Sequence, residues 1–293
     1  MKLSVKAPAK INLSLDIVSK RPDGYHDVAM VMQAVSLYDT VTVSDEVDES
    51  VTDDVVVTCD DPAIPTDSRN IVCKAAKAFF RYCDITPVKI SVDIKKNIPS
   101  QAGLAGGSTD AAAVILAMNR IFDTKLNSSQ MCEIGSNVGA DVPFCIVGGT
   151  MHAKGIGTDM SKLPNLTKCS ILICKPDVCV STAEAYAKAD SRENKGFIVT
   201  DEVVKMIFRR NLRGVCQCLY NDFEVVMQLD EINAIKKTMV KNKALGACMS
   251  GSGSAVYGIF LNEKKALNCK EVMQSEFEKL YVCSPIKGGC EIV

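Results

Sequence analysis

Hydrophobic and polar side chains alternate near the start of the chain. Between residues 11 and 17, apolar side chains fill the odd positions from Ile11 to Ile17, and polar side chains fill the even positions from Asn12 to Asp16. This period of two predicts a β-strand with one buried face and one polar face. Lys10 and Asn12 share the polar face. Residues 21–24, Arg-Pro-Asp-Gly, supply the proline and glycine that a tight turn requires.

More strands and helices are predicted in the next hundred residues. Strands are expected around residues 41–43, 55–57 and 88–94, and the acidic segment 45–54 is expected to be a solvated loop. Apolar residues recur with helical spacing from Ile71 to about Cys83, in a helix that Asp67-Ser68 can cap. Further helices are predicted over residues 108–122 and 129–138, the second stopping at Gly139, and Asp141 with Pro143 opens another short element.

The pattern changes after about residue 160. A short apolar strand is predicted over residues 170–174, and helices are predicted over 181–190, 200–220, 228–242 and 264–280. A second small-residue loop, 249–254, leads into a strand that reaches Phe260, and a last strand follows the final helix. Strands and helices do not alternate strictly, which favours an α+β fold with two lobes. We expect a first domain of residues 1–160 and a second of residues 161–293.

Charge and composition exclude several broad classes of function. The 34 basic and 35 acidic residues give a net charge of −1, which argues against a wide electrostatic grip on nucleic acid or on an anionic membrane. The longest clearly apolar stretch, residues 111–118, is far shorter than a membrane-spanning helix. Lys6 and Lys10 interrupt any apolar core of the signal-peptide type. We therefore expect a cytoplasmic protein with a small-molecule partner.

The chain contains 14 cysteines but only two histidines. No two cysteines form a Cys-x-x-Cys pair, and the closest spacings, such as Cys216 to Cys218, do not suit a zinc ribbon. We expect most thiols to be reduced and to act as small apolar core residues. The alternative, a redox or metal–sulfur protein, lacks any ligand spacing to support it.

A loop of small residues precedes the helix predicted at residue 108. Glycines at 103, 106 and 107 allow backbone amides to approach a bulky anion, and the start of a helix presents free N–H groups. Together they form a phosphate cradle, to which Ser108 and Thr109 add hydroxyl groups. No lysine follows Gly107, so the loop is not a Walker motif, and the dinucleotide pattern is also absent. The alternative is a tight strand-to-helix turn capped by Ser108.

Two charged residues could carry phosphoryl transfer to a small alcohol. A carboxylate and an ammonium, together with amides that position the phosphates, suffice for that reaction. Lys10 lies on the polar face of the first strand, and Asp141 follows Gly139. The alternatives are an exposed strand lysine for Lys10 and a helix N-cap for Asp141. The second small-residue loop could also approach a ligand, or could be a flexible hairpin or a bulge.

Three segments in this order resemble the GHMP kinase superfamily. They are KAPAKINLSLDIV near the start, IPSQAGLAGGSTDAA in the first small-residue loop and LGACMSGSGSAVYGIF near the end. Three others are similar to the branch of that superfamily that phosphorylates 4-diphosphocytidyl-2-C-methyl-D-erythritol, namely KRPDGYHDV, VGADVPF and VSTAEAY. The resemblance implies a two-lobed GHMP kinase fold, with an N-terminal lobe like ribosomal protein S5 and a ferredoxin-like C-terminal lobe.

The resemblance also implies roles for matching residues. Asp141 would take the proton from the acceptor hydroxyl, and Lys10 would hold Asp141 ionised and stabilise charge at the phosphate. ATP is implied as co-substrate with Mg²⁺, although no carboxylate pair marks a metal site. Its phosphates would contact Pro99, Ser100, Gln101, Ala102, Gly103, Leu104, Ala105, Gly106, Gly107, Ser108 and Thr109. Asn70 and Lys96 are weaker candidates for contact with the adenosine end.

The acceptor site is implied by four other residues. Asn12 would position the methylerythritol end of the substrate. Tyr25 and Tyr186 would sandwich a cytosine ring, and His26 would hydrogen-bond to the polar edge of the ring, a combination suited to one defined base. Tyr25 and His26 could instead simply pack beside the turn at residues 22–24.

The sequence departs from the family pattern at three positions. Ala105 replaces a frequent glycine, Thr109 replaces a serine, and Ser254 stands where proline is frequent. We expect activity to survive these changes and nucleotide affinity to be affected. Other functions remain open: a GHMP kinase acting on mevalonate, homoserine or a sugar, a nucleotide-binding regulator without catalysis, or a structural scaffold. A regulator is expected to lack Lys10 or Asp141, and both are present.

Overall fold

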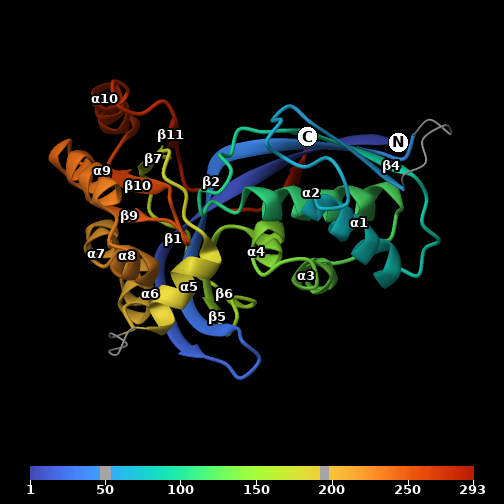
Figure 1. Ribbon diagram of the computed structural model, residues 1–293, viewed down its shortest axis with the longest axis horizontal. Coiled ribbons are helices and arrows are strands. Elements are labelled where there is room, and N and C mark those ends of the chain that lie inside the picture. Colours follow the sequence, from blue (N-terminus) through green and yellow to red (C-terminus); the bar gives the residue numbers. More distant parts are fainter. Residues whose placement is uncertain (47–53, 192–197) are drawn as a thin grey trace.

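The computed structural model describes residues 1–46, 54–191 and 198–293. It contains two sheets with helices packed against each, in two lobes (Figure 1). This confirms the predicted α+β architecture. Most of the acidic segment predicted as a solvated loop, residues 47–53, lies outside the described residues.

The larger sheet is built on a long antiparallel hairpin of β1 and β2, and it extends through β4 to β3. The connection at residues 21–25 contains the predicted turn, where Gly24 has a φ of +88°. Residues 2–20 and 26–44 form strands, longer than the alternating pattern alone predicted. The strands are β1 (Lys2–Lys20), β2 (His26–Ser44), β3 (Val55–Cys59), β4 (Ile90–Lys95), β5 (Thr150–Lys154), β6 (Asp159–Lys162), β8 (Tyr220–Asn221) and β12 (Glu291–Ile292).

Four helices lie along one face of this sheet (Figure 1). They are α1 (Ile71–Tyr82), α2 (Gly106–Ile121), α3 (Ser128–Ser136) and α4 (Val142–Val147). Asn70, and not Asp67-Ser68, caps α1, because its side chain accepts a hydrogen bond from the Val72 amide. Helix α2 begins two residues earlier than predicted, so Gly106 and Gly107 belong to its first turn.

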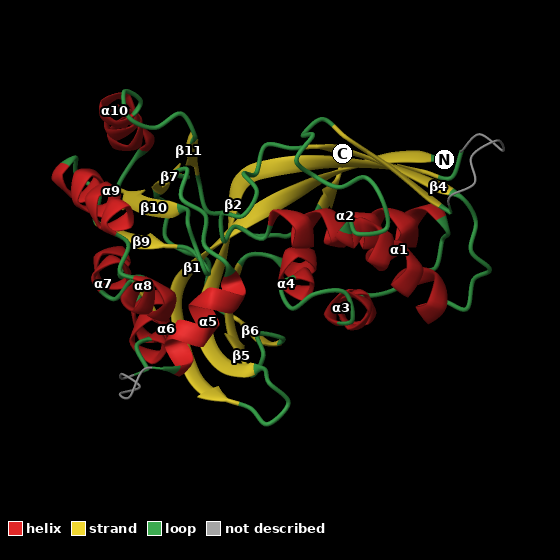
Figure 2. Ribbon diagram, viewed as in Figure 1, coloured by secondary structure: helices red, strands yellow, loops and turns green. Residues whose placement is uncertain are grey.

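The smaller sheet has the strand order β11-β7-β10-β9 and is antiparallel throughout (Figure 2). Its strands are β7 (Ser170–Cys174), β9 (Gly246–Met249), β10 (Val256–Phe260) and β11 (Leu280–Cys283). The helices of this half are α5 (Thr182–Asp190), α6 (Thr200–Phe208), α7 (Leu212–Gln217), α8 (Asp222–Met227), α9 (Asp230–Lys241) and α10 (Glu263–Met273).

Two helices predicted in this half are shorter than the pattern indicated. The segment 200–220 is interrupted after α6. Arg210 has a φ of +52°, which is incompatible with a right-handed α-helix. Asn211 then caps α7 by accepting a hydrogen bond from the Gly214 amide. The segment 264–280 stops being helical at Met273, and the strand β11 begins at Leu280. Amphipathic spacing continues through both breaks, so the breaks were not predicted.

Strand β1 is not half-buried as predicted. Register shifts between Pro8 and Ala9 and between Asn12 and Ser14 move its odd-numbered side chains from one face to the other. Ile11 and Leu13 therefore pack in one buried cluster, while Leu15 and Ile17 pack in another. The polar face is also buried, because the other lobe covers it. Asp16, for example, accepts hydrogen bonds from the Thr200 amide and hydroxyl at 2.9 and 2.6 Å.

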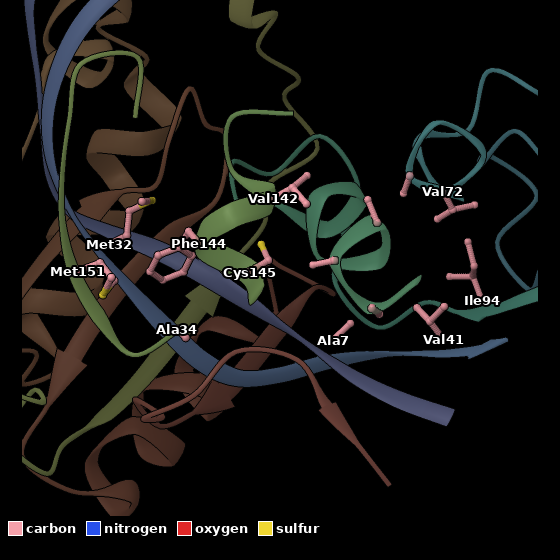
Figure 3. Packing of buried hydrophobic residues seen from close by; sticks show 14 of the residues in the cluster. Ala7, Met32, Ala34, Val41, Val72, Ile94, Val142, Phe144, Cys145 and Met151 are labelled. Carbon is pink, nitrogen blue, oxygen red and sulfur yellow. The ribbon is translucent and has the colours of Figure 1, made fainter. Parts of the chain in front are cut away.

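The core of the first lobe lies between the larger sheet and helices α1, α2 and α4. Figure 3 shows Met32 and Met151 from neighbouring strands beside Phe144 of α4, and Val41 and Ile94 facing the helices farther along the sheet. Eight of the fourteen cysteines are buried, and no disulfide joins the cysteines of the described residues, as expected for apolar core positions. None of the helices in the described residues is long and apolar enough to cross a membrane.

Two short strands of the second half of the chain pair with the larger sheet. Residues of β8 pair with β1 at Ser14 and Leu15, and residues of β12 pair with β1 at Val5 and Lys6. In Figure 1 the C-terminus accordingly lies beside the N-terminal sheet. Strand β6 also belongs to this sheet and ends at Lys162. The division between residues 160 and 161 stays a prediction.

Candidate active site

A cavity of about 1390 Å³ lies where the lobes meet. Its walls include Lys10, Asn12 and Leu15 of β1, the loop that precedes α2, the start of α4 and the helix α5. Every residue predicted for the site lines this cavity except Thr109. Thr109 is fully buried in α2, and its hydroxyl lies 3.6 Å from the Cys290 thiol. Its predicted contact with the nucleotide is therefore not supported by its position.

Lys10 is a buried charge and not an exposed strand lysine. Its residue is 4 % exposed. The ammonium donates hydrogen bonds to the Asn12 side-chain oxygen at 2.7 Å and to the Gly103 carbonyl at 3.0 Å. It lies 3.9 Å from a carboxylate oxygen of Asp141. A buried lysine keeps its charge only with such partners, and this one faces the cavity with a carboxylate beside it.

Asp141 occupies the N-cap position of α4, but its side chain makes no capping hydrogen bond. The capping role that was considered for it is thus unfilled. Pro143 in the first turn of α4 needs no capping acceptor, because proline has no N–H. The Asp141 side chain is 33 % exposed and lines the cavity, so its carboxylate can meet a ligand while Lys10 remains its neighbour.

The start of α2 presents unused hydrogen-bond donors. No side chain caps this helix, and no acidic residue occupies its first turn. The amides of Gly106, Gly107 and Ser108 have no acceptor among the described residues, and all three residues line the cavity. Free N–H groups and the positive end of a 16-residue helix form an anion site. Ser108 therefore lies within the first turn and does not cap the helix, as the alternative required.

Ala105 precedes this turn with a φ of +61°, a conformation that costs alanine more than glycine. This is the physical reason why a glycine is frequent there in the family that the loop resembles. The substitution is accommodated, since the helix begins at the next residue.

The two small-residue loops contact each other, which the sequence did not reveal. A Cβ atom on Gly103 would lie 2.0 Å from the Ser250 carbonyl oxygen. The Ser250 hydroxyl donates to the Gly103 carbonyl at 2.9 Å, and the Gly251 amide donates to the Asn12 side chain at 3.1 Å. Gly103 thus permits contact between loops, whereas the prediction had assigned its lack of a side chain to anion binding.

Buried partners hold the second loop in place. Asn221 of β8 donates to the carbonyls of Met249 and Gly251, both at 2.8 Å. The Tyr257 hydroxyl, fully buried in β10, donates to the Asn12 carbonyl at 2.7 Å. These residues were not predicted for the site. Only their long-range contacts identify them, and the local pattern of a strand tyrosine or a loop asparagine does not.

Lys96 lies under the start of α2 between two buried carboxylates, Asp39 and Asp110. Asp39 also accepts hydrogen bonds from the amides of Asn97 and Ile98 at 2.7 and 2.8 Å. One oxygen of Asp110 has no hydrogen-bond partner within the described part of the chain. Burial opposes the charge of Lys96, but the two carboxylates outweigh it and raise its pKa.

Asp110 is the member of this cluster that keeps a proton. Burial, together with the charge of Asp39, raises the pKa of Asp110 to about 8, although Lys96 acts in the opposite direction. Asp110 lines the cavity and was missed, because an aspartate inside an alanine-rich helix gives no local signal.

Asn70 uses both ends of its side chain within the protein. Its oxygen caps α1, and its amide donates to the Pro65 carbonyl at 2.7 Å. The residue also lines the cavity. Its contact with adenosine stays a prediction.

Aromatic residues also line the cavity. His26, the first residue of β2, stacks on Tyr186 of α5 with ring centroids 4.4 Å apart and an angle of 19° between planes. Tyr186 in turn meets the edge of Phe223. Burial and the charge of Asp141 raise the pKa of Tyr186. Tyr25 lines the cavity but is 64 % exposed, and the stacked pair is His26 with Tyr186. The sandwich of a base between Tyr25 and Tyr186 stays a prediction.

Comparison with known proteins places this geometry in a family. Residues 70–149 match the N-terminal domain of GHMP kinases, and residues 203–279 match their C-terminal domain. The chain belongs to the GHMP kinase family. A protein of Acetivibrio thermocellus named 4-diphosphocytidyl-2-C-methyl-D-erythritol kinase is 41 % identical over 286 residues, 97 % of this chain and 99 % of that protein. A Clostridium tetani protein of the same name is 40 % identical, over 97 % of this chain and all of its own.

Solved structures of GHMP kinases have the same fold. A crystal structure of 4-(cytidine 5'-diphospho)-2C-methyl-D-erythritol kinase superimposes with a TM-score of 0.79 and 25 % identity, over 99 % of this chain and 100 % of that one. Homoserine kinase from Cytophaga hutchinsonii gives a TM-score of 0.78 at 19 % identity, over 100 % of this chain and 97 % of that one. At 19 % identity, the similarity to homoserine kinase shows only that the two proteins share the GHMP kinase fold.

Proposed function

We propose that the protein transfers the γ-phosphoryl group of ATP to the 2-hydroxyl of 4-diphosphocytidyl-2-C-methyl-D-erythritol, a step of non-mevalonate isoprenoid precursor biosynthesis. The observation that carries the proposal is the pair of Lys10 and Asp141, which lie 3.9 Å apart. The free amides at the start of α2 and the aromatic residues His26 and Tyr186 line the same cavity. Relatives about 40 % identical over nearly the whole chain bear the name of that kinase.

Asp141 acts as the base in this mechanism. Its carboxylate is free of capping bonds and faces the cavity, so it can accept the proton of the acceptor hydroxyl. Lys10, buried beside it, stabilises negative charge on the carboxylate and on the transferring phosphoryl group. The hydroxyl attacks the phosphorus directly, ADP leaves, and no covalent intermediate on the protein is required.

The free amides at the start of α2 bind the ATP phosphates. A 16-residue helix without an acidic first turn complements their negative charge. Residues 99–108 surround the nucleotide in this arrangement, and Asn70 and Lys96 line its adenosine side. Because these backbone amides are already in position, they can hold the γ-phosphoryl group near the acceptor hydroxyl without a rearrangement of the protein during the reaction.

Mg²⁺ fits this site as a companion of the nucleotide. The described residues contain no group of three or more metal-ligating side chains. Mg²⁺ is commonly held through one or two carboxylates and the substrate phosphates, and Asp141 and the Ser108 hydroxyl lie on the cavity wall. When bound, the cation would neutralise phosphate charge. In this proposal the protein acts in the cytoplasm on small-molecule substrates and binds neither nucleic acid nor a membrane.

An ADP-release assay with ATP and magnesium tests the proposal. The acceptors are 4-diphosphocytidyl-2-C-methyl-D-erythritol and, in parallel, mevalonate, homoserine and galactose. ADP release with the cytidyl acceptor alone is the expected result. Release with another acceptor alone would keep a GHMP kinase and reject the proposed substrate. ATP binding without release from any acceptor would favour a nucleotide-binding regulator.

The Asp141→Asn variant tests the base. Loss of the carboxylate removes the proton acceptor but leaves α2 and its amides in place, so turnover should fall at least about 100-fold while ATP binding changes little. Turnover is measured by ADP release, and ATP binding by calorimetry. Glu184→Gln, also on the cavity wall but part of the solvated face of α5, serves as the matched control. Near-normal turnover in Asp141→Asn would remove Asp141 as the base.

A further inference from the structure

The last residues of the chain, 285–293, pack against the helix that begins after Asp141. We call them the C-terminal segment. The segment is held on the larger sheet at two places: the Ile286 amide donates a hydrogen bond to the Ala34 carbonyl of β2 at 2.9 Å, and Glu291 of β12 pairs with β1. None of the residues of this described segment lines the cavity. Any influence on the site must therefore pass through the helices that the segment contacts.

The contact between the C-terminal segment and α4 leaves no space for a side chain. A Cβ atom on Gly289 would lie 2.2 Å from the Cys145 carbonyl oxygen and 2.5 Å from that of Ile146. A Cβ atom on Gly148, the C-cap of α4, would lie 2.1 Å from the backbone of Gly288. Backbone thus lies directly against backbone along the last turn of α4, an approach that glycine permits because it has no Cβ.

The segment also completes the hydrogen bonding of α4. The Cys290 amide donates to the Cys145 carbonyl at 3.0 Å. That carbonyl lies in the last turn, where a helix has no N–H of its own to offer. Helix α4 has only six residues, and a helix this short persists only with tertiary contacts. Its conformation therefore depends on a segment at the other end of the sequence.

A displacement of α4 at Cys145 reaches Asp141 directly. The Cys145 amide donates to the Asp141 carbonyl at 3.1 Å, so the two residues are linked by one helical hydrogen bond. The Asp141 carboxylate lies 3.9 Å from the Lys10 ammonium, which is held independently by β1 and by the first small-residue loop. A shift of α4 therefore changes the separation of the carboxylate and the ammonium.

The same segment contacts α2. The Cys290 sulfur lies 3.6 Å from the hydroxyl oxygen of Thr109 and 3.6 Å from its carbonyl oxygen. The free amides of the anion site begin this helix at Gly106. Cys290 thus contacts both the helix of the anion site and the helix that follows the proposed base.

We propose that the C-terminal segment is a positioning element for phosphoryl transfer, in which Gly289 and Cys290 fix α4 so that Asp141 lies beside Lys10 and near the phosphates bound at α2. The inference rests on the proposed function, because it takes Asp141 as the base. The segment acts through α4 and α2, without contact to the reacting groups.

Gly289→Ala is the first test, and Gly288→Ala is its matched control. The new methyl group forces the Cys145 carbonyl oxygen to retreat by about 0.8 Å, from 2.2 to 3.0 Å, the shortest distance that such contacts show. No atom lies within 4 Å of a Cβ atom on Gly288. The segment is anchored on both sides of Gly289, at residues 286 and 291, so the short helix is the part that must move.

Turnover and nucleotide binding should separate in Gly289→Ala. A misplacement of about 1 Å can cost about 100-fold, so kcat in the ADP-release assay should fall roughly 10- to 100-fold. The dissociation constant of ATP, measured by calorimetry, should change little, because α2 is held by its own buried contacts. Gly288→Ala should match the wild type in both quantities. An unchanged kcat in Gly289→Ala, or weaker ATP binding with kcat unchanged, would overturn the proposal.

A second control separates positioning from a general loss of stability. Met273→Ala removes a side chain that is 1 % exposed in α10 of the other lobe and that does not line the cavity. The vacated space destabilises the fold. Urea unfolding should show a loss of stability in both Met273→Ala and Gly289→Ala, but kcat should fall only in Gly289→Ala. An equal fall of kcat in both variants would indicate a structural role only and would overturn the proposal.

Hydrogen exchange of the wild type gives a test that needs no variant and no substrate. If the segment holds α4, the two open together, and the amides of Cys290 and Cys145 should have similar protection factors. Protection of Cys290 lower than that of Cys145 by on the order of 100-fold would show that the segment opens while α4 stays folded, and would refute the positioning role. This measurement decides the question even if Gly289→Ala does not fold.

The two kinds of failure are distinguishable. Exchange tests the positioning role whatever the enzyme phosphorylates. Similar protection of the two amides, in a wild type that does not turn over the cytidyl acceptor, would refute the proposed function and leave the link between the segment and α4 in place. The comparison of kcat is then made with the acceptor that the wild type does phosphorylate.

Discussion

The contact between the two small-residue loops can be tested by adding one methyl group. In Gly103→Ala the new Cβ would lie 2.0 Å from the Ser250 carbonyl oxygen, and real contacts of this kind are not shorter than 3.0 Å. The second loop must therefore retreat by about 1 Å. Gly103 also has a φ of +70°, a conformation that costs an alanine roughly 1–2 kcal/mol. Overpacking adds ~1–3 kcal/mol, so the free energy of unfolding should fall by about 2–5 kcal/mol.

Gly155→Ala is the matched control for this substitution. Gly155 has a similar φ of +61°, but no atom lies within 4 Å of a Cβ built there. It should lose only the backbone cost of roughly 1–2 kcal/mol. The difference between the two variants isolates the contact between the loops from the strain that both share.

Activity should respond more strongly than stability. The Gly103 carbonyl accepts hydrogen bonds from the Lys10 ammonium at 3.0 Å and from the Ser250 hydroxyl at 2.9 Å. A shift of about 1 Å misplaces Lys10 relative to Asp141, and such a displacement can cost about 100-fold in turnover. Urea unfolding and ADP release measure the two effects. The reasoning is refuted if Gly103→Ala matches Gly155→Ala in both unfolding free energy and kcat.

Three further predictions concern buried polar groups. The pKa of Asp110 is about 8 in the fold against 3.8 for a free side chain, so its contribution to stability is full below about pH 4 and is lost as the pH rises through 8. In the wild type, the free energy of unfolding should fall by about 1 kcal/mol per pH unit where this loss is steepest. Urea unfolding at a series of pH values should show that Asp110→Asn lacks this fall. The same dependence on pH in both proteins would contradict a neutral Asp110 carboxyl. Tyr257→Phe leaves the Asn12 carbonyl without its donor and should lower the unfolding free energy by about 1–3 kcal/mol, whereas a change below measurement error would mean that the bond contributes nothing net. Lys10→Gln removes the cation beside Asp141 and should lower kcat at least roughly 100-fold in the ADP-release assay; a loss of only a few-fold would place the stabilising charge elsewhere.

Local patterns predicted most of the elements and the central pair of the site. The alternation around Asn12 predicted β1, and the family segments brought Lys10 and Asp141 together before any geometry was known. The register shift after Asn12 was not predicted, because a bulge changes the face of a residue without changing its hydrophobicity. As a result Leu15, and not Ser14, lines the cavity.

The remaining site residues depend on contacts between distant segments. Asp110 is a polar residue inside an apolar helix, and only the structure shows that it shares Lys96 with Asp39. In the sequence, Asp190 is one more charged residue near the end of a predicted surface helix. Only the structure shows that its carboxylate lies 2.7 Å from Nε2 of His26, which is 164 residues away in the sequence. Glycines in loops are equally ambiguous, because the same absence of a side chain permits contact with a ligand or with another backbone.

The pairing of β12 and β8 with β1 has a consequence for how the chain is synthesised. Translation produces β1 first, but its neighbours on that edge, at Val5 and at Ser14, arrive only with the last third of the chain. Until then β1 has no strand partner at these positions, and an unpaired strand edge invites association with other chains. Such distant pairings also slow folding, because their ends must meet after a long search. A nascent chain of this kinase should therefore need shielding on the ribosome for longer than its first lobe alone would suggest, and shortened forms that lack β12 should aggregate.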